Sequence, residues 1–296
     1  MSNSQTGTGR TPGVLAIVLN WNGLEFTKEC CASLARQTYP NLRVVVVDNG
    51  STENTVEDLR KACPNADVVF STGRNLGFAG GVNAGFSRAA ESGGTNDYVW
   101  LLNNDTVCDP DALERLVLKA ETDPMICAVG CQMEEGGEDS SAYSRLAQAG
   151  KQLRPPLWTP REPKTPNDID YICGASMLIR VESAMKQNDL LDAGYFFFFE
   201  DADWCFTARE RGWKLGVAEG VFIKHKGSAT IKRTSYNLAS YYRAGHVRFL
   251  RKHAPHPFFP SLLAFLYRII VDALRLNFAG VRGNIAGFIR GWRAEV

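Results

Sequence analysis

The chain has 296 residues, of which 45% are hydrophobic and 22% are charged. This length predicts one large or two modest domains with a sizeable core, and the composition excludes a wholly disordered, collagen-like or coiled-coil chain. The 33 Lys and Arg residues nearly balance the 32 Asp and Glu residues, so the total charge gives no reason to expect nucleic acid as a partner.

The eight cysteines show neither a C-x-x-C pair nor the Cys/His spacing of a zinc finger. Residues 1–12 are polar and rich in Gly, Ser and Thr, which predicts a flexible leader rather than a signal peptide. We therefore expect a cytoplasmic protein whose thiols are reduced and mostly buried.

Strand-like and helix-like segments alternate from residue 14 to beyond residue 110. Apolar or β-branched runs predict strands at residues 14–20, 42–48, 68–73 and 98–105. Helices are expected at residues 24–37 and 53–62, from a Gly-rich turn at 75–81 to about residue 90, and again after residue 111. This order predicts an α/β fold with a doubly wound, mostly parallel sheet and flanking helices.

The pattern is less regular after residue 131. Residues 132–170 contain EEGGEDSS and the proline-rich RPPLWTPREPKTP, which predict a long, partly mobile loop of the kind that often forms a lid. A strand is expected in YICGASMLIR, and a helix is expected near residues 182–187.

The last part of the chain is basic. From residue 241 onwards, nine Lys and Arg residues stand against two Asp and Glu residues. Arg268, Asp272 and Arg275 mark one face of a predicted helix, and apolar residues mark the opposite face. These apolar residues are Leu262, Phe265, Leu266, Ile269, Ala273 and Leu276. The apolar run is shorter than the roughly 20 residues that span a bilayer, so this amphipathic tail either packs on the main domain or lies in a membrane interface.

Polar residues stand at the predicted end of each of the first four strands. They are Asn20, Asp48-Asn49-Gly50-Ser51, Gly73-Arg74-Asn75 and Asn103-Asn104-Asp105. In doubly wound sheets, ligands bind outside the carboxyl ends of the strands. The four strand ends therefore predict one crevice that takes a polar ligand.

Two of these segments have the chemistry of nucleotide binding. Asp48 and Asn49 could hydrogen-bond a ribose or a base, although Asp-Asn-Gly-Ser is also favourable in an ordinary turn. The Gly-rich segment 74–81 could present backbone N–H groups and Arg74 to a phosphate, or could be a structural turn. It matches neither G-x-G-x-x-G nor the Walker A motif.

Acidic residues and one histidine could carry the chemistry. Asp105 is a suitable oxygen ligand for Mg²⁺ or Mn²⁺, or alternatively part of an Asx turn. Glu200, Asp201 and Asp203 follow four phenylalanines; their mutual repulsion and burial would raise a carboxyl pKa as a general base needs, although acidic residues also favour helix starts. His225 could join Asp105 in a metal site or be structural.

The chain resembles family 2 glycosyltransferases of the GT-A fold, in the branch similar to bacterial rhamnosyltransferases. Seven segments carry the resemblance, in the family's order, over roughly residues 14–230. They are VLNWNG, SLARQTYPNLRVVVVDNGST, GRNLGFAGGVNAGF, YVWLLNNDT, CGASMLIR, FFFFEDADWCFTARERGW and KHKGSA. The resemblance implies a GT-A domain at 13–235, with a nucleotide-binding half at about 13–110, an acceptor half at about 111–235, and a basic helical tail at 236–296.

The resemblance also implies roles for individual residues. Asp201 matches the catalytic base, beside Glu200. Asp105 matches the metal-binding motif with Asn103 and His225, although Asn-Asn-Asp replaces D-x-D, and the cofactor is a divalent cation, Mg²⁺ or Mn²⁺. The donor-binding set is Asn20, Asp48, Asn49, Arg74, Asn75, Gly77, Gly80, Asn83 and Asn104. Trp158, Asp203 and Trp204 are expected near the acceptor.

The expected activity is inverting transfer of a sugar from a nucleotide diphosphate donor to a hydroxyl of a glycan or lipid-linked glycan. Rhamnose from dTDP-rhamnose is the donor that the family resemblance favours, in polysaccharide biosynthesis for the cell envelope at the inner face of the cytoplasmic membrane. A catalytically inactive nucleotide-sugar-binding or scaffold protein of the same fold is the main alternative. A nucleotidyltransferase would need a basic, Gly-rich loop after the first strand, where Asn20-Trp21-Asn22-Gly23 stands, and an oxidoreductase would need a dinucleotide fingerprint.

Overall fold

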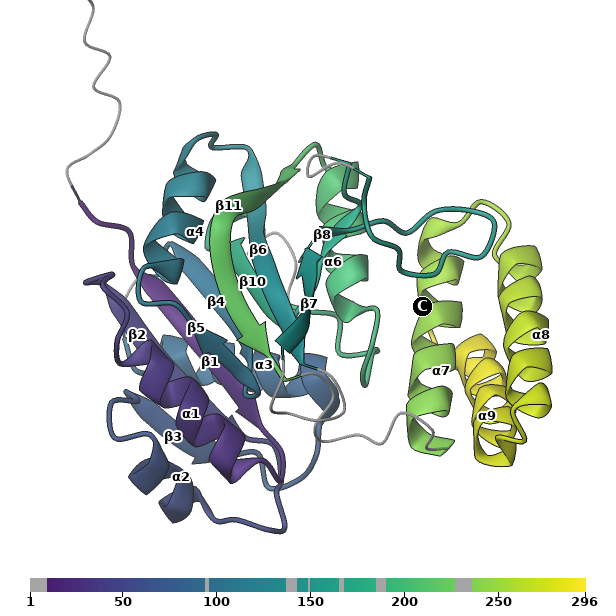
Figure 1. The fold of residues 1–296 in the computed structure, drawn as a ribbon, viewed down its shortest axis with the longest axis horizontal. Helices are drawn as coiled ribbons and strands as arrows, with labels where there is room; N and C mark the ends of the chain where they lie inside the picture. Colours follow the sequence, from purple (N-terminus) through teal and green to yellow (C-terminus); the bar gives the residue numbers. More distant parts are fainter. Residues whose placement is uncertain are drawn as a thin grey trace, which may run out of the picture.

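The computed structural model describes residues 10–93, 96–136, 143–148, 150–164, 168–184, 190–226 and 236–296. A nine-stranded sheet carries helices on both faces, and three C-terminal helices lie beside it (Figure 1). The strands are β1 (Val14–Asn20), β2 (Leu42–Asp48), β3 (Val68–Ser71), β4 (Tyr98–Asn103), β5 (Thr106–Cys108), β6 (Ile126–Gly136), β7 (Tyr143–Gln148), β8 (Gly150–Lys151), β9 (Tyr171–Ile172), β10 (Ser176–Arg180) and β11 (Lys214–His225). The helices are α1 (Leu24–Leu34), α2 (Val56–Ala62), α3 (Gly77–Glu91), α4 (Ala112–Glu121), α5 (Val181–Ala184), α6 (Glu200–Glu210), α7 (Tyr236–His253), α8 (Phe258–Leu274) and α9 (Phe278–Arg293).

The first half of the sheet is parallel, in the order β3-β2-β1-β4. Its central strand β1 is apolar because it is buried on both faces, with α1 and α2 on one side and α3 on the other (Figure 1). In the register of the sheet, Asn20 lies opposite Asp48, and Leu19 lies opposite Asn103. The polar strand ends therefore meet at one edge, and the predicted α/β fold with a doubly wound sheet is confirmed.

The second half of the sheet is mixed. Strand β10 runs antiparallel between β4 and β6, while β11 is parallel to β6 and antiparallel to β5. The irregular loop predicted over residues 132–170 is wrong for residues 143–148, which form β7, and for residues 132–136, which continue β6 and pair with β7 and β11. The pairing with two neighbours satisfies the backbone there in spite of the Glu- and Gly-rich sequence.

Several predicted boundaries shift by a few residues. Helix α2 begins at Val56 rather than at residue 53, because Thr55 and Asp58 form a capping box. Helix α1 ends at Leu34, and the predicted Gly-rich turn already enters α3 at Gly77. The helix predicted at 182–187 is the short α5, and residues 185–187 lie outside the described residues.

The prediction of reduced thiols is wrong for one pair of cysteines. Cys31 in α1 and Cys63 after α2 form a disulfide, with their Cα atoms 5.5 Å apart. Five of the six other thiols are buried, as expected, and Cys173 is partly exposed.

The C-terminal helices pack through glycines and a buried polar network. Gly283, Gly287 and Gly291 of α9 face α7 so closely that an added side chain would meet α7 directly. Inside the bundle, Arg243 of α7 donates to the carbonyl of Ala264 in α8 at 3.0 Å and to Oδ1 of Asn284 in α9 at 3.2 Å. The network joins all three helices.

The helix predicted over residues 262–276 is α8, but Asp272 of its charged side faces inward. Asp272 is fully buried and accepts hydrogen bonds from Arg268, Asn277 and Asn284. Among the described residues, no helix combines the length and the apolar character needed to cross a bilayer.

Candidate active site

A cavity of about 700 Å³ opens where the carboxyl ends of β1 and β4 meet α3, α6 and α7. Its polar lining residues are Asn49, Asn75, Asn103, Asn104, Asp105, Glu200, Asp201, His225 and Asn237. Aromatic side chains line much of the remainder, namely Trp21, Phe78, Tyr171, Phe196, Phe197, Phe198, Phe199, Tyr241 and Tyr242. The cavity therefore combines a polar floor at the sheet edge with an aromatic side toward α7.

Asn49 connects the end of β2 to the Gly-rich start of α3. Its Nδ2 donates to Oδ1 of Asn75 at 3.2 Å and to the carbonyl of Gly77 at 3.0 Å. Gly77 has a φ of +77°, and a side chain there would clash with the backbone of Phe196. The next N–H group, that of Phe78, donates to the Phe196 carbonyl at 2.7 Å. Only glycine allows this close approach, which joins the start of α3 to the segment before α6.

Only part of the predicted donor-binding set reaches the cavity. Asn49, Asn75, Gly77 and Asn104 line it. Asn20, Asp48, Arg74, Gly80 and Asn83 lie outside the lining.

Some of the residues outside the lining hold neighbouring segments together, and Arg74 is exposed to solvent. Asn20 and Asp48 are buried behind the cavity and hydrogen-bond each other at 3.3 Å. Asn83 holds α3 to the backbone of Leu191 through two hydrogen bonds. Arg74 is exposed. Sequence could not separate these roles, because a buried brace and a ligand contact both call for short polar side chains at a strand end.

Asp105, His225 and Asn103 meet in the polar floor, although 120 residues separate the first two along the chain. Nε2 of His225 lies 3.3 Å from Oδ1 of Asp105 and 3.4 Å from Nδ2 of Asn103. The pairing of β11 with β5 places His225 opposite Thr106 and so beside Asp105. The sequence prediction that these three residues converge agrees with this geometry.

This group of three offers a carboxylate, an imidazole and an amide to a divalent cation. Within the described ranges, no group of three or more His, Cys, Asp or Glu side chains is arranged to hold a metal ion. Mg²⁺ and Mn²⁺ often use only one or two protein ligands and take the remainder from substrate phosphates and water. The donor set therefore fits such an ion bound together with a diphosphate.

Glu200 and Asp201 begin α6 at the other side of the cavity. Phe198 and Phe199 before them have φ values of +72° and +73°, a conformation that is strained for bulky residues and is concentrated at functional sites. Asp201 accepts backbone hydrogen bonds from Gly174 and Ala202, both at 2.8 Å. Among the described residues, the buried Oε2 of Glu200 has no hydrogen-bond partner.

The two neighbouring carboxyl groups differ in acidity. Burial raises the pKa of Glu200 well above its usual value, and the charge of Asp201 raises it further. Burial also raises the pKa of Asp201, but hydrogen bonds from the backbone N–H groups of Gly174 and Ala202 oppose that rise. Asp201 is therefore the first of the pair to ionise.

The three predicted acceptor residues do not line the cavity. The ring of Trp158 packs against Phe206 and Phe249, and Trp204 is buried in the core. Asp203 ties α6 to α7, since it pairs with His253 at 2.8 Å and with Lys252 at 2.6 Å. We assign no acceptor contact to Trp158, Asp203 or Trp204.

Sequence reasoning missed the aromatic side of the cavity. Tyr241 stacks on Phe196 with 4.5 Å between the ring centroids, and Tyr242 contacts the rings of Phe198 and Phe199. The Tyr-Tyr-Arg run at the start of α7 was the available signal, but only the docking of α7 brings it to the cavity.

The chain matches known glycosyltransferases. Residues 16–187, more than half of the chain, match the sequence profile described as glycosyl transferase family 2. The chain belongs to this family. It is therefore a glycosyltransferase, as its sequence motifs and the polar edge of its sheet indicate.

Two bacterial relatives show the range within this family. An N-acetylglucosaminyl-diphospho-decaprenol L-rhamnosyltransferase of Mycobacterium tuberculosis is 26% identical over 248 residues, which cover 75% of this chain and 79% of that protein. A poly-beta-1,6-N-acetyl-D-glucosamine synthase of Staphylococcus aureus is 27% identical over 118 residues, which cover 40% of this chain and 27% of that protein.

Two solved structures share the GT-A fold. The mannosyltransferase PcManGT from Pyrobaculum calidifontis, in complex with GDP-Man and Mn²⁺, has a TM-score of 0.59 at 18% identity and covers 97% of this chain and 77% of its own. GalNAc-T7 with UDP, GalNAc and Mn²⁺ has a TM-score of 0.63 at 14% identity, covering 97% of this chain and 55% of its own. Together with the three C-terminal helices, these similarities confirm the predicted fold class.

Proposed function

We propose that the protein is an inverting glycosyltransferase that moves a sugar from a nucleotide diphosphate donor to an acceptor hydroxyl in the cavity. One observation carries the proposal: Asp105 and His225 lie in the same cavity as Asp201, although three separate parts of the chain supply them. Asp105 and His225 suit a leaving diphosphate, and Asp201 suits an attacking hydroxyl.

The donor would lie along residues 13–110, the half that supplies most of the polar floor. The side chains of Asn49, Asn75 and Asn104 and the start of α3 at Gly77 line the cavity there. Asp105, His225 and Asn103 would hold Mg²⁺ or Mn²⁺, which neutralises charge on the diphosphate. Asn104 is held by hydrogen bonds to Gly23 and Thr27, and so fixes the turn that carries Asp105.

Asp201 would act as the general base. Its two backbone hydrogen bonds fix the carboxylate and favour its charged form, while burial raises the pKa of Glu200 beside it well above the usual value. The ionised Asp201 would accept the proton of the acceptor hydroxyl as the oxygen attacks the anomeric carbon. One displacement of this kind inverts the configuration of the sugar.

The acceptor would enter along residues 111–235 and the aromatic side formed with α7. The mycobacterial relative is named for a rhamnosyl transfer to a lipid-linked N-acetylglucosamine. By analogy we propose rhamnose from dTDP-rhamnose as the donor and a lipid-linked glycan as the acceptor, in cell-envelope polysaccharide synthesis. The protein would then act in the cytoplasm, at the inner face of the membrane.

The test is release of a nucleoside diphosphate from a panel of nucleotide sugars, including dTDP-rhamnose, GDP-mannose and UDP-N-acetylglucosamine. Each donor is incubated with the purified chain and Mg²⁺, Mn²⁺ or EDTA, and thermal stabilisation by each nucleotide is measured in parallel. We expect metal-dependent release from one donor. Stabilisation by a nucleotide without turnover of any donor would favour the inactive binding protein instead.

A further inference from the structure

Helix α8 turns an apolar stripe to the solvent. The stripe follows the helical repeat along the outer side of α8, the outermost helix in Figure 1. Its members are Phe259, Leu263, Leu266, Tyr267, Ile270 and Leu274, whose exposed fractions lie between 47% and 80%. In a helix that packs on a soluble domain, such a stripe normally faces the core.

The orientation of α8 is fixed by the buried Asp272. Asp272 is fully buried, where Arg268 donates to it at 3.0 Å and Asn284 of α9 donates to it at 3.0 Å. Rolling the helix to hide its apolar stripe would break these hydrogen bonds and leave a buried polar network unpaired. The packing of α8 therefore keeps the apolar stripe exposed.

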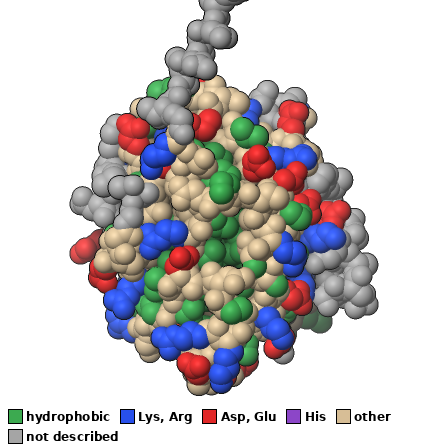
Figure 2. All heavy atoms as spheres, turned by 90° about the vertical axis from the view of Figure 1, so that its left-hand side faces the viewer, with side chains coloured by type: hydrophobic (Ala, Val, Ile, Leu, Met, Phe, Trp, Pro, Cys, Tyr) green, Lys and Arg blue, Asp and Glu red, His purple; other side chains and the backbone are tan. Residues whose placement is uncertain are grey.

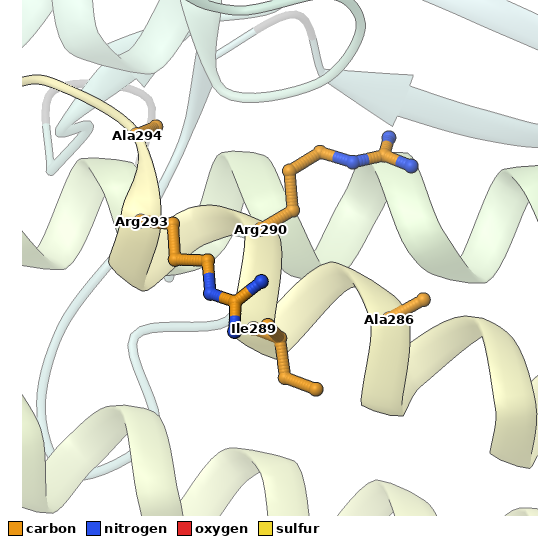
Figure 3. Close-up of a pocket in the computed structure, with 5 residues that line it drawn as sticks. All are labelled: Ala286, Ile289, Arg290, Arg293 and Ala294. Carbon is orange, nitrogen blue, oxygen red and sulfur yellow. The ribbon is translucent and has the colours of Figure 1, made fainter.

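Exposed arginines stand at the end of α8 and on α9. Arg275 ends α8, and Arg282, Arg290 and Arg293 lie on α9. Over residues 236–296, all of which are described, none of the four forms an ion pair with an acidic side chain. Arg290 and Arg293 line a hollow of about 470 Å³, where Figure 3 shows Arg293 extending on the same side of α9 as Ile289.

The opposite end of the molecule has a different surface. In Figure 2, which views the side of the sheet away from the C-terminal helices, Lys and Arg side chains alternate with Asp and Glu side chains. The four exposed arginines of α8 and α9 thus contrast with the mixed charges of that face.

We propose that α8 and α9 dock on the surface of an anionic lipid bilayer. The apolar stripe would enter the boundary between headgroups and acyl chains, and the arginines would contact lipid phosphates. A second copy of the chain fits this surface less well, because a two-fold contact would bring the same unpaired arginines together.

The docking surface lies one helix away from the cavity. Helix α7 packs on α9 and supplies Tyr241 to the cavity, and the guanidinium of Arg290 lies 5.7 Å from the Tyr241 ring. A bilayer on α8 and α9 would therefore bring a lipid-linked acceptor near the aromatic side. This last step rests on the proposed function, whereas the docking itself does not.

The test is cosedimentation of the full chain with vesicles, without any sugar donor. Vesicles of phosphatidylcholine alone are compared with vesicles that also contain phosphatidylglycerol. We expect binding to the anionic vesicles that weakens as salt is raised, and a loss of affinity on the order of 10- to 100-fold in the Leu263→Gln/Ile270→Gln variant. Leu118→Gln, at an exposed leucine of α4, is the matched control and should bind as wild type does.

Three results would overturn docking on a bilayer. One is the absence of binding to either kind of vesicle, and the second is equal binding by the α8 variant. The third is a pair of results: wild type does not bind vesicles but is a dimer by light scattering, and the α8 variant is a monomer. Because donor hydrolysis needs no membrane, it should be unchanged in the α8 variant, so failure of the proposed function is detected separately.

Discussion

Glu200 and Asp201 are adjacent in sequence, yet burial disfavours the charged form of Glu200 more strongly than that of Asp201. Asp201 accepts two backbone hydrogen bonds, whereas Oε2 of Glu200 is buried and has no hydrogen-bond partner among the described residues. Burial and the charge of Asp201 raise the pKa of Glu200 well above its usual value. Asp201 is therefore the first of the two to lose its proton, and it can act as a base.

This difference predicts a pH-dependent stability of the Glu200→Gln variant. Burial raises the pKa of Glu200 in the folded state, so above about pH 4.5 the folded protein holds a proton that the unfolded chain has lost. The contribution of Glu200 to the free energy of unfolding is therefore fully present below that pH. It decreases as the pH rises, by up to about 1.4 kcal/mol per pH unit. Glutamine keeps the shape of the Glu200 side chain but does not ionise.

Thermal unfolding across a pH series checks this prediction. The melting temperature of Glu200→Gln should exceed that of wild type by a margin that grows as the pH rises above about 4.5. A difference that is the same at every pH would show that Glu200 has an ordinary pKa.

Sequence predicted the residues at the cavity better than their individual roles. The convergence of Asp105 with His225 could be predicted, because strand ends and family order both point to it. Asp203 and Trp204 could not be excluded without the structure. They follow Asp201 by two and three residues, and at about 100° per residue the helix turns them toward α7 and the core.

At the scale of elements, α7 holds the segment that carries the carboxyl pair. The backbone of Phe198 lies close to Gly245 of α7. A Cβ added to Gly245 would lie 2.5 Å from the carbonyl oxygen of Phe198. Phe198 and Phe199 adopt their left-handed conformations directly beside this contact. The first turn of α6 is thus positioned by Gly245, which lies 45 residues after Glu200 in the chain.

Gly245→Ala should therefore disturb α6 through this contact. We expect a loss of about 1–3 kcal/mol in the free energy of unfolding, as for overpacking of a filled core, together with reduced turnover. Gly216→Ala in β11 is the matched control, because its Cβ would have no neighbour nearer than 3.4 Å. Denaturant unfolding of both variants checks the prediction, and equal stability of the two would contradict it.

Element prediction succeeded where the periodic signal was strong. The four Val- and Leu-rich runs that predict strands became the parallel half of the sheet. The continuation of β6 through residues 132–136 was missed, because pairing with β7 and β11 overrides local composition. In α8 the apolar repeat was visible, but repeat alone does not tell which side of a helix is covered.

At the scale of the whole molecule, the cavity is assembled from distant parts. The parallel half of the sheet supplies Asn49 and Asp105, β11 supplies His225, and α6 supplies Asp201. The C-terminal helices close the aromatic side and present the surface that we assign to a bilayer. The division into two halves at about residue 110, and the tail from residue 236, stay predictions, and the boundary at 235 lies outside the described residues.

The most direct test of the account is Asp201→Asn, with turnover and donor affinity measured side by side. Asparagine keeps the size of the side chain but cannot take a proton from the acceptor hydroxyl. We predict that the turnover number falls by about 10²- to 10⁴-fold, while the dissociation constant of the donor stays near that of wild type. Glu210→Gln, at an exposed position of the same helix, should leave both values unchanged. Near-wild-type turnover of Asp201→Asn would contradict the assignment of Asp201 as the base and the mechanism built on it.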